Sequence, residues 1–171
     1  MRAAPRIAMS LGALLMASAA AVAARMPLES FSGVWTGQGT DRDSPMQSLQ
    51  KTRCRNTVKA DATHMNSHTE CTGEAGLNKR FDLSITFKGD RFTGKLDYVS
   101  TERGGAPQRY AGEVTGSRTD EVADFIVRFS GLTPNAHVVL RLTSATSYAM
   151  VVSVLGSTLT DVKFHRPPPG Q

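Results

Sequence analysis

The stretch that decides the fold is Phe31-Ser32-Gly33-Val34-Trp35-Thr36-Gly37-Gln38-Gly39, which contains the only tryptophan of the chain. In an extended strand successive side chains alternate between two faces, so one face carries Gly33, Trp35, Gly37 and Gly39. The indole is therefore flanked by positions without a side chain, and another segment can lie directly across the ring. This pattern predicts that Trp35 plugs one end of the interior of a small antiparallel barrel.

From Gly33 onward, apolar and polar residues alternate with period two, and turn-forming residues interrupt the pattern about every 8 to 12 residues. The clearest hairpin joins a strand with apolar residues from Phe81 to Phe87 to a returning strand at residues 91–99, through a turn at Gly89-Asp90. The other expected strands are residues 33–39, 48–59, 63–73, 108–116, 122–130, 136–144, 148–155 and 158–166. Because the connections are short, the strands should form an all-β, antiparallel up-and-down meander of about 8 to 10 strands that closes into a barrel.

Residues 1–24 are predicted to form a signal peptide. Arg2 and Arg6 precede a short apolar run at residues 7–17, and the small residues Ala21-Val22-Ala23-Ala24 follow, which is the order that a signal peptidase requires. The alternative, an uncleaved membrane anchor, is disfavoured because the run is shorter than the roughly 20 residues that span a bilayer. We therefore expect residues 25–166 to form one periplasmic or extracellular barrel domain that does not span a membrane, followed by a disordered tail at residues 167–171.

The charge balance is mildly basic. The full chain has a net charge of +5, and removal of residues 1–24 reduces its 20 basic residues to 18, against 15 acidic ones. Basic and acidic residues are interspersed without a run of about five or six like charges. The pattern does not indicate nucleic-acid binding.

Cys54 and Cys71 are the only cysteines of the chain. An even pair in an exported protein predicts a disulfide. The bridge would close a loop of about 17 residues and stabilise the fold by about 3 kcal/mol in the chain-entropy model. The alternative, a redox or metal pair, lacks the Cys-x-x-Cys spacing and neighbouring ligands.

No group of residues predicts catalysis or metal binding. One face of an expected strand carries His64, Asn66, His68 and Glu70. Residues four apart on a strand are separated by roughly 13 Å, which is too far for a shared ion. Ser48-Leu49-Gln50-Lys51 has the Ser-x-x-Lys spacing of penicillin-recognising enzymes, but it lies in an expected strand and the partner motifs are missing. We therefore expect no metal site and no catalytic residues.

The last expected strand has Thr160, Val162, Phe164 and Arg166 on one face. If the first and last strands pair to close the barrel, Arg166 can stack on Trp35 and cap the interior, as guanidinium planes do on aromatic rings. Alternatively, Arg166 ends its strand in solvent.

The Gly33-Val34-Trp35 motif near the start of an all-β chain, with Arg166 near its end, resembles the lipocalins and the wider calycin group of ligand-carrying barrels. The longer Gly-x-Trp-x-Gly-x-Gly pattern is similar to the opening of nitrobindins, ten-stranded barrels that hold haem through a histidine near the C terminus. His165 lies near that end, but the surrounding nitrobindin motifs are absent, so we expect no haem or other cofactor. The resemblance implies a calycin-like barrel.

A further likeness covers nearly all of the chain after residue 24 and is to a family of small secreted proteins of bacteria such as the rhizobia. The features that carry it are Phe31 to Gly39, Cys54-Arg55, Cys71, Gly89 to Gly94, Gly112 to Gly116, Gly156 and Arg166. This family carries no activity that could be transferred. The likeness implies export, the disulfide and the barrel, and it leaves function open.

The apolar strand faces, combined with the absence of catalytic motifs, predict a barrel that binds a small apolar or amphipathic molecule in its mouth without chemistry. The alternative is a structural or inhibitory protein-interaction module whose barrel is filled by Phe81, Leu83, Phe87, Phe92, Phe125 and Phe129. A small-molecule enzyme would require two polar side chains to meet inside the barrel. The sequence predicts no particular ligand-binding residue.

Overall fold

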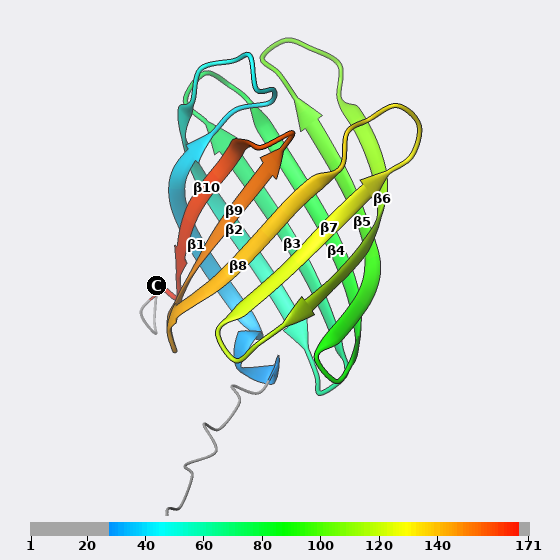
Figure 1. Cartoon of the computed structure of the whole chain (residues 1–171). Helices are drawn as coiled ribbons and strands as arrows, with labels where there is room; N and C mark the ends of the chain where they lie inside the picture. The colour runs from blue at the N-terminus through cyan, green and yellow to red at the C-terminus, as the bar shows by residue number, and fades with distance from the viewer. Residues whose placement is uncertain (1–27, 168–171) are drawn as a thin grey trace, which may run out of the picture.

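The structure of the chain is a computed structural model that describes residues 28–167. The expected signal peptide at residues 1–24 and residues 168–171 of the expected tail lie outside the described residues. Within the described part, a closed barrel of antiparallel strands follows a short 3-10 turn (Figure 1). The elements are η1 (Leu28–Phe31), β1 (Gly33–Asp41), β2 (Gln50–Ala60), β3 (His64–Gly73), β4 (Asn78–Lys88), β5 (Arg91–Thr101), β6 (Gln108–Arg118), β7 (Val122–Phe129), β8 (Ala136–Ser144), β9 (Ser147–Val154) and β10 (Ser157–His165).

Each strand pairs with its neighbours along the chain, and β1 pairs with both β2 and β10, which closes the barrel. The predicted all-β, up-and-down architecture is therefore confirmed. The main differences are at strand ends, because backbone pairing extends β4 upstream to Asn78 and β1 downstream to Asp41. These extensions add Lys79 and Asp41 to the inward face of the wall, where both are buried.

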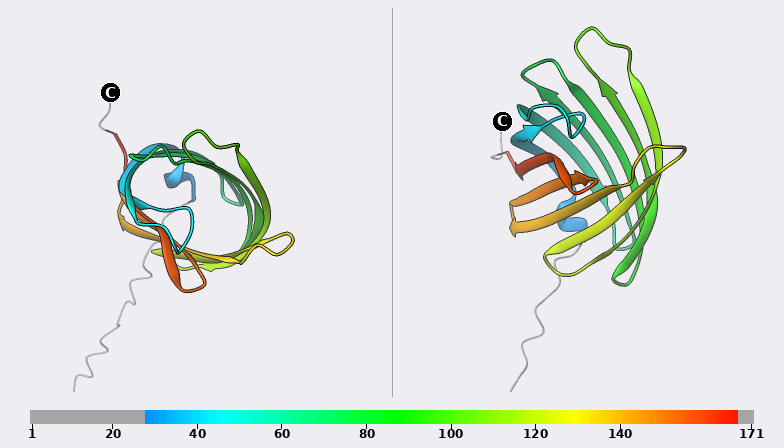
Figure 2. Two further views of the ribbon diagram at one scale, coloured as in Figure 1. Left: turned by 90° about the horizontal axis from the view of Figure 1, so that it is seen from above. Right: turned by 45° about the horizontal axis from the view of Figure 1, so that its top comes forward.

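The two ends of the barrel differ. One end carries η1, and in a view down the barrel axis this turn lies at the far end of the interior (Figure 2). We call this the closed end and the opposite end the mouth. The mouth is surrounded by the β1–β2, β3–β4, β5–β6, β7–β8 and β9–β10 connections (Figure 1).

Trp35 is the central residue of the closed end and is 1% exposed. Its indole Nε1 donates a hydrogen bond to the carbonyl oxygen of Phe31 at 2.9 Å, which ties η1 across the opening. The Arg166 guanidinium lies over the indole, 4.6 Å from the ring centroid, and donates to the carbonyl oxygen of Ser30. Tyr148 packs against the same indole in a T-shaped arrangement, with a centroid distance of 5.1 Å and an interplanar angle of 75°. Arg166 therefore caps the interior rather than ending in solvent.

The glycines of β1 let β10 approach closely. A Cβ atom at Gly37 would lie 2.8 Å from the Phe164 ring, and one at Gly39 would collide with the carbonyl oxygen of Asp161. Gly33 serves a different purpose, because it has a φ of +132° where the chain passes from η1 into β1. The space left by the glycines beside Trp35 is thus occupied by β10, the strand that closes the barrel.

Cys54 and Cys71 form the predicted disulfide. They lie directly opposite each other on β2 and β3, and both side chains are buried inside the barrel.

We expect the double variant Cys54→Ala/Cys71→Ala to lower the free energy of unfolding by about 3 kcal/mol, because the 17-residue separation of the bridge restricts the unfolded chain. Denaturant unfolding with and without dithiothreitol measures this loss. Reductant should destabilise the wild type and leave the variant unchanged. Coincident unfolding curves of the two proteins without reductant would contradict the prediction.

His68 lies on the outer face of β3 beside two carboxylates. Its Nδ1 is 2.5 Å from Oδ1 of Asp82, and its Nε2 is 3.4 Å from Oε1 of Glu70. Asp82 also pairs with Arg80 at 3.1 Å. The hydrogen bond with Asp82 is the main cause that raises the pKa of His68 above 6.5.

A raised pKa means that the folded state holds the proton more tightly than the unfolded state. The contribution of protonated His68 to the free energy of unfolding should therefore be fully present below pH 6.5. It should disappear as the pH rises through the folded-state pKa of His68. We expect the His68→Gln variant to lose less unfolding free energy than the wild type as the pH rises through this range. Urea unfolding between about pH 5.5 and pH 9 measures the difference. A variant whose profile runs parallel to that of the wild type across the range would refute this role of His68.

Candidate ligand-binding cavity

A cavity of about 580 Å³ lies inside the barrel and reaches the mouth. Its volume falls within the range of about 300 to 1,000 Å³ that is typical of small-molecule sites. The lining includes residues from the β1–β2 loop, the β7–β8 loop and the β9–β10 turn, as well as inward-facing residues of the wall. The arrangement can therefore admit a ligand from the mouth.

One wall of the cavity is aromatic. Its side chains come from four successive strands, β4 to β7, and are Phe81, Tyr98, Tyr110 and Phe129. Phe81 and Tyr98 are register partners and stack with a centroid distance of 4.9 Å and an interplanar angle of 11°. Tyr98 and Tyr110 are also register partners and stack at 5.5 Å and 19°. Cross-strand pairing thus produces a continuous ring surface along this wall.

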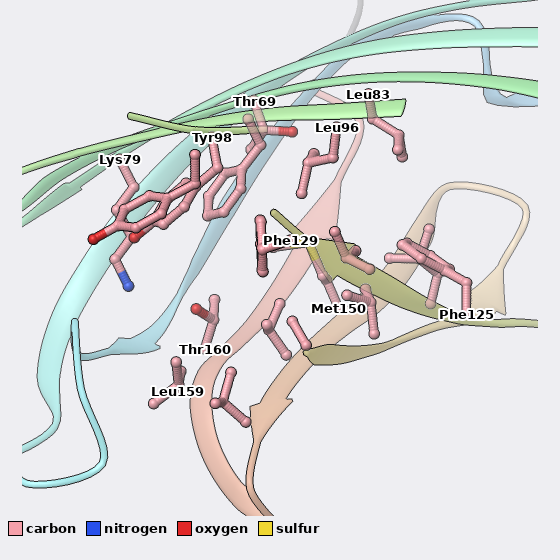
Figure 3. A pocket seen from close by; sticks show the side chains of 18 of the residues that line it. Thr69, Lys79, Leu83, Leu96, Tyr98, Phe125, Phe129, Met150, Leu159 and Thr160 are labelled. Atoms are coloured by element: carbon pink, nitrogen blue, oxygen red, sulfur yellow. The ribbon is translucent and has the colours of Figure 1, made fainter. Parts of the chain in front are cut away.

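The remaining apolar wall is largely aliphatic and comes from β8, β9 and β10. It consists of Ala136, Val138, Leu140, Met150, Val152, Val154 and Leu159. Leu159 belongs to the wall because the β9–β10 register shifts between Thr158 and Thr160, which adds a residue to β10 at this point. In the close-up, Phe129, Met150 and Leu159 surround the same open space (Figure 3).

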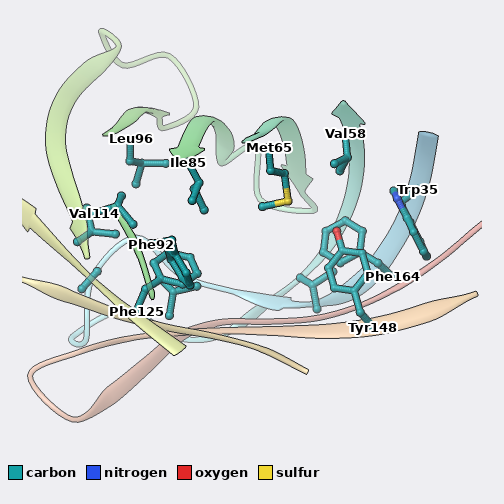
Figure 4. Close-up of a cluster of buried hydrophobic side chains, with 14 of the residues drawn as sticks. Trp35, Val58, Met65, Ile85, Phe92, Leu96, Val114, Phe125, Tyr148 and Phe164 are labelled. Carbon is teal, nitrogen blue, oxygen red and sulfur yellow. The ribbon is translucent and has the colours of Figure 1, made fainter. Parts of the chain in front are cut away.

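The deeper part of the cavity ends on the packed core. Met65, Leu96 and Phe125 line the cavity and also belong to the buried cluster that continues toward the closed end (Figure 4). Beyond them, Phe92 packs against both Phe87 and Phe125, with centroid distances of 5.2 and 5.7 Å. The interior is therefore filled at the closed end and open toward the mouth.

A buried ion pair lies where the wall approaches the mouth. The Lys79 ammonium donates to Oδ1 of Asp41 at 2.8 Å and to the carbonyl oxygen of Arg42 at 2.7 Å. The Lys79 and Asp41 side chains are only 3% and 2% exposed. The Thr160 hydroxyl donates to the same Asp41 oxygen at 2.7 Å. Lys79 and Thr160 line the cavity, so this cluster gives a mostly apolar space a polar end (Figure 3).

Asp43 places a second carboxylate at this end. Its Oδ1 accepts hydrogen bonds from the Ser100 hydroxyl at 2.6 Å and from the Tyr98 hydroxyl at 3.0 Å. Burial is the main cause that raises the pKa of Tyr98, so the phenol keeps its proton and remains a donor. The Asp43 side chain is 19% exposed and lines the cavity.

A further polar group lies on the wall deeper in the cavity. The Asn56 amide donates to the Tyr148 hydroxyl at 2.7 Å and accepts from the Ser67 hydroxyl at 2.8 Å. All three residues line the cavity. Burial raises the pKa of Tyr148, so this group stays uncharged.

Exposed apolar side chains gather at the mouth. Leu132 in the β7–β8 loop is fully exposed, Leu155 in the β9–β10 turn is 80% exposed, and Met46 in the β1–β2 loop is 94% exposed. Leu155 has a φ of +50°, a conformation that a leucine rarely adopts, and it is followed by Gly156 at +77°. Leu132 and Leu155 also line the cavity, so the apolar lining continues onto the rim.

The structure separates the residues that the sequence singled out. Trp35, Gly33, Gly37, Gly39 and Arg166 do not line the cavity and belong to the closed end and the β1–β10 seam. Of the six side chains expected to fill the barrel, Phe87 and Phe92 pack in the core, whereas the other four line the cavity: Phe81, Leu83, Phe125 and Phe129.

Sequence reasoning missed Asp41, Asp43 and Lys79. A signal for two of them was present, because Lys79 continues the period-two pattern of Phe81 to Phe87 and Asp41 continues that of Trp35 to Gly39. Asp43 lies in a loop, where no periodicity applies.

The histidines lie apart from the cavity lining in the described part of the chain. His165 is exposed on β10 and forms a hydrogen bond with the Thr36 hydroxyl at 3.1 Å. His64 and His68 are exposed on β3. Among residues 28–167, no group of three or more His, Cys, Asp or Glu side chains is placed to hold a metal ion.

Comparison with protein-family models gives no match, and comparison with curated proteins finds no similar sequence. No helix within residues 28–167 is long and apolar enough to cross a membrane. The function is therefore inferred from the cavity itself.

We expect Lys79→Met to lower the free energy of unfolding by about 3 to 5 kcal/mol, because it leaves the buried Asp41 carboxylate without its cation. The double variant Lys79→Met/Asp41→Leu should recover most of this loss, since it removes both charges at similar volume. Urea unfolding of the wild type and the two variants measures the effect. A single variant within about 1 kcal/mol of the wild type would contradict a buried ion pair at this position.

Proposed function

We propose that this protein is an exported, calycin-like carrier that binds a small apolar or amphipathic molecule inside its barrel without changing it chemically. The observation that carries the proposal is the cavity of about 580 Å³, which has aromatic and aliphatic walls and opens at the mouth. Burial of apolar ligand surface against such walls supplies the free energy of binding. The polar end formed by Lys79, Thr160 and Asp43 favours an amphipathic ligand over a purely apolar one.

Export is part of this proposal. The signal-like pattern of residues 1–24 supports it, and so does the disulfide between Cys54 and Cys71, because such bonds persist in oxidising compartments. A carrier outside the cytoplasm would move its ligand through water between apolar environments.

An interaction module with a filled barrel is less well supported, because the aromatic side chains of β4 to β7 lie along the wall and leave the interior open. An enzyme would require polar side chains to meet inside the barrel, and Asp41 and Lys79 do meet there. However, the Lys79 ammonium is held by Asp41 and the Arg42 carbonyl, so it is no free nucleophile, and Asp41 already accepts from Lys79 and Thr160. This saturated pair favours binding over chemistry.

We expect Val152→Phe to weaken binding of Nile red, a neutral apolar dye, by about tenfold or more, because the larger side chain occupies cavity volume. Val152 faces the cavity, whereas Val151, the residue before it, lies on the opposite face of β9. Val151→Phe is therefore the matched control and should bind the dye like the wild type. Fluorescence titration measures the dissociation constants, and thermal unfolding checks that both variants fold.

The carrier proposal fails if the wild type shows no saturable dye binding. It also fails if the two phenylalanine variants weaken binding equally, since the dye would then bind outside the barrel.

A further inference from the structure

We propose that the Asp43 carboxylate selects amphipathic ligands with a cationic, amine-type head group and holds that head at the mouth. The inference rests on the proposed carrier function and names its ligand class. It follows from the charges and free hydrogen-bonding atoms at the polar end of the cavity.

At the polar end, two carboxylates, Asp41 and Asp43, share one ammonium group, that of Lys79. Lys79 and Asp41 neutralise each other across 2.8 Å, whereas the Lys79 ammonium is 4.0 Å from Oδ1 of Asp43. Within residues 28–167, the other groups that donate side-chain hydrogen bonds to the Asp43 carboxylate are the uncharged hydroxyl groups of Tyr98 and Ser100. Because Asp43 shares Lys79 with the closer Asp41, a further cation at the edge of this apolar cavity would be attracted to Asp43, where the surrounding dielectric constant is low.

Arg42 does not supply that cation. Within residues 28–167, Arg42 forms no ion pair with Asp43, and its guanidinium donates instead to the carbonyl oxygens of Thr158, Pro45 and Gln47. This arginine braces the β1–β2 loop, which carries Asp43. The loop therefore presents a carboxylate whose ion-pair partner within residues 28–167 is Lys79, at the longer distance of 4.0 Å.

One oxygen of Asp43 is available to a ligand. Every side-chain hydrogen bond that this carboxylate accepts within the described residues ends on Oδ1, as does its approach to Lys79. Oδ2 accepts no side-chain hydrogen bond from the described residues, and in this proposal it receives the ligand's donor. An alkylammonium group provides three such donors and a positive charge, which gives a charge-assisted hydrogen bond.

An anionic head group fits this end poorly. Lys79 is the one cation that lines the cavity within residues 28–167, and it already donates to Asp41 and to the Arg42 carbonyl. A carboxylate or sulfonate that approached Lys79 would also approach Asp43 and be repelled. The ligand's apolar chain would extend from Asp43 between the stacked rings and the aliphatic wall. In Figure 3, Phe125 lies across this space from Lys79, at the other end of the path.

The net charge of the chain opposes the proposed preference for cationic ligands, so such a preference would point to a local site. Without residues 1–24 the chain still carries 18 basic against 15 acidic residues, so its overall field weakly repels cationic amphiphiles and attracts anionic ones. A preference for amines would therefore have to arise from a local site.

The experiment displaces bound Nile red with three ligands that share a twelve-carbon chain: dodecylamine, dodecanol and sodium dodecanoate. Each is used at about pH 7, below its solubility limit and, for the two ionic ligands, below the critical micelle concentration. We expect dodecylamine to displace the dye from the wild type at about tenfold or more lower concentration than either of the others. Asp43→Asn keeps an oxygen that Tyr98 and Ser100 can donate to, and it should abolish the preference while dodecanol still displaces the dye.

Asp161→Asn is the matched control, because Asp161 is an exposed carboxylate on β10, and it should retain the wild-type preference. Equal potency of the three ligands on the wild type, or a preference for dodecanoate, would overturn the inference while dye binding still supports a carrier. A preference that persists in a folded Asp43→Asn variant would overturn it as well. The wild-type series decides the question even if that variant fails to fold, whereas absence of dye binding would reject the carrier proposal itself.

Discussion

The packing of Arg166 and Tyr148 on the Trp35 indole is the contact on which the barrel depends. It joins the first strand to the last one and to β9, so it closes the sheet and fills the same end of the interior. The hydrogen bonds from Trp35 to Phe31 and from Arg166 to Ser30 then hold η1 across that end. Since η1 and the buried rings occupy the closed end, the open volume lies toward the mouth.

The Lys79–Asp41 pair is the main exception to an apolar interior. Burying two charges costs free energy that their attraction only partly offsets, so such a pair is weak evidence for stability. Its position suits the proposed carrier function better, because Thr160 and the Arg42 carbonyl fix both groups beside the neighbouring Asp43. The pair keeps one end of the cavity polar and holds the β1–β2 loop at the mouth.

Much of the fold was predictable from local patterns. The period-two alternation located the strands, and the cysteine pair indicated the disulfide that joins β2 and β3. Asp41 and Lys79 lie two residues beyond the expected limits of their strands. A charged residue at such a position is normally interpreted as the end of the buried, apolar face. Asp43 could not be found in this way, because its neighbours Tyr98 and Ser100 are more than fifty residues away in the sequence.

The cavity was beyond sequence reasoning for a geometric reason, since aromatic residues occur at both ends of the barrel and their orientations decide whether they fill it. Toward the closed end, Phe92 meets Phe87 and Phe125 at interplanar angles of 53° and 69°, and a Cβ at Gly116 would lie 2.7 Å from the Phe92 ring. Rings that cross the barrel interior over a glycine fill the space at that end of the barrel. Nearer the mouth, Tyr98 lies nearly parallel to Phe81 and Tyr110, so these rings form a wall and leave the space beside them free for a ligand.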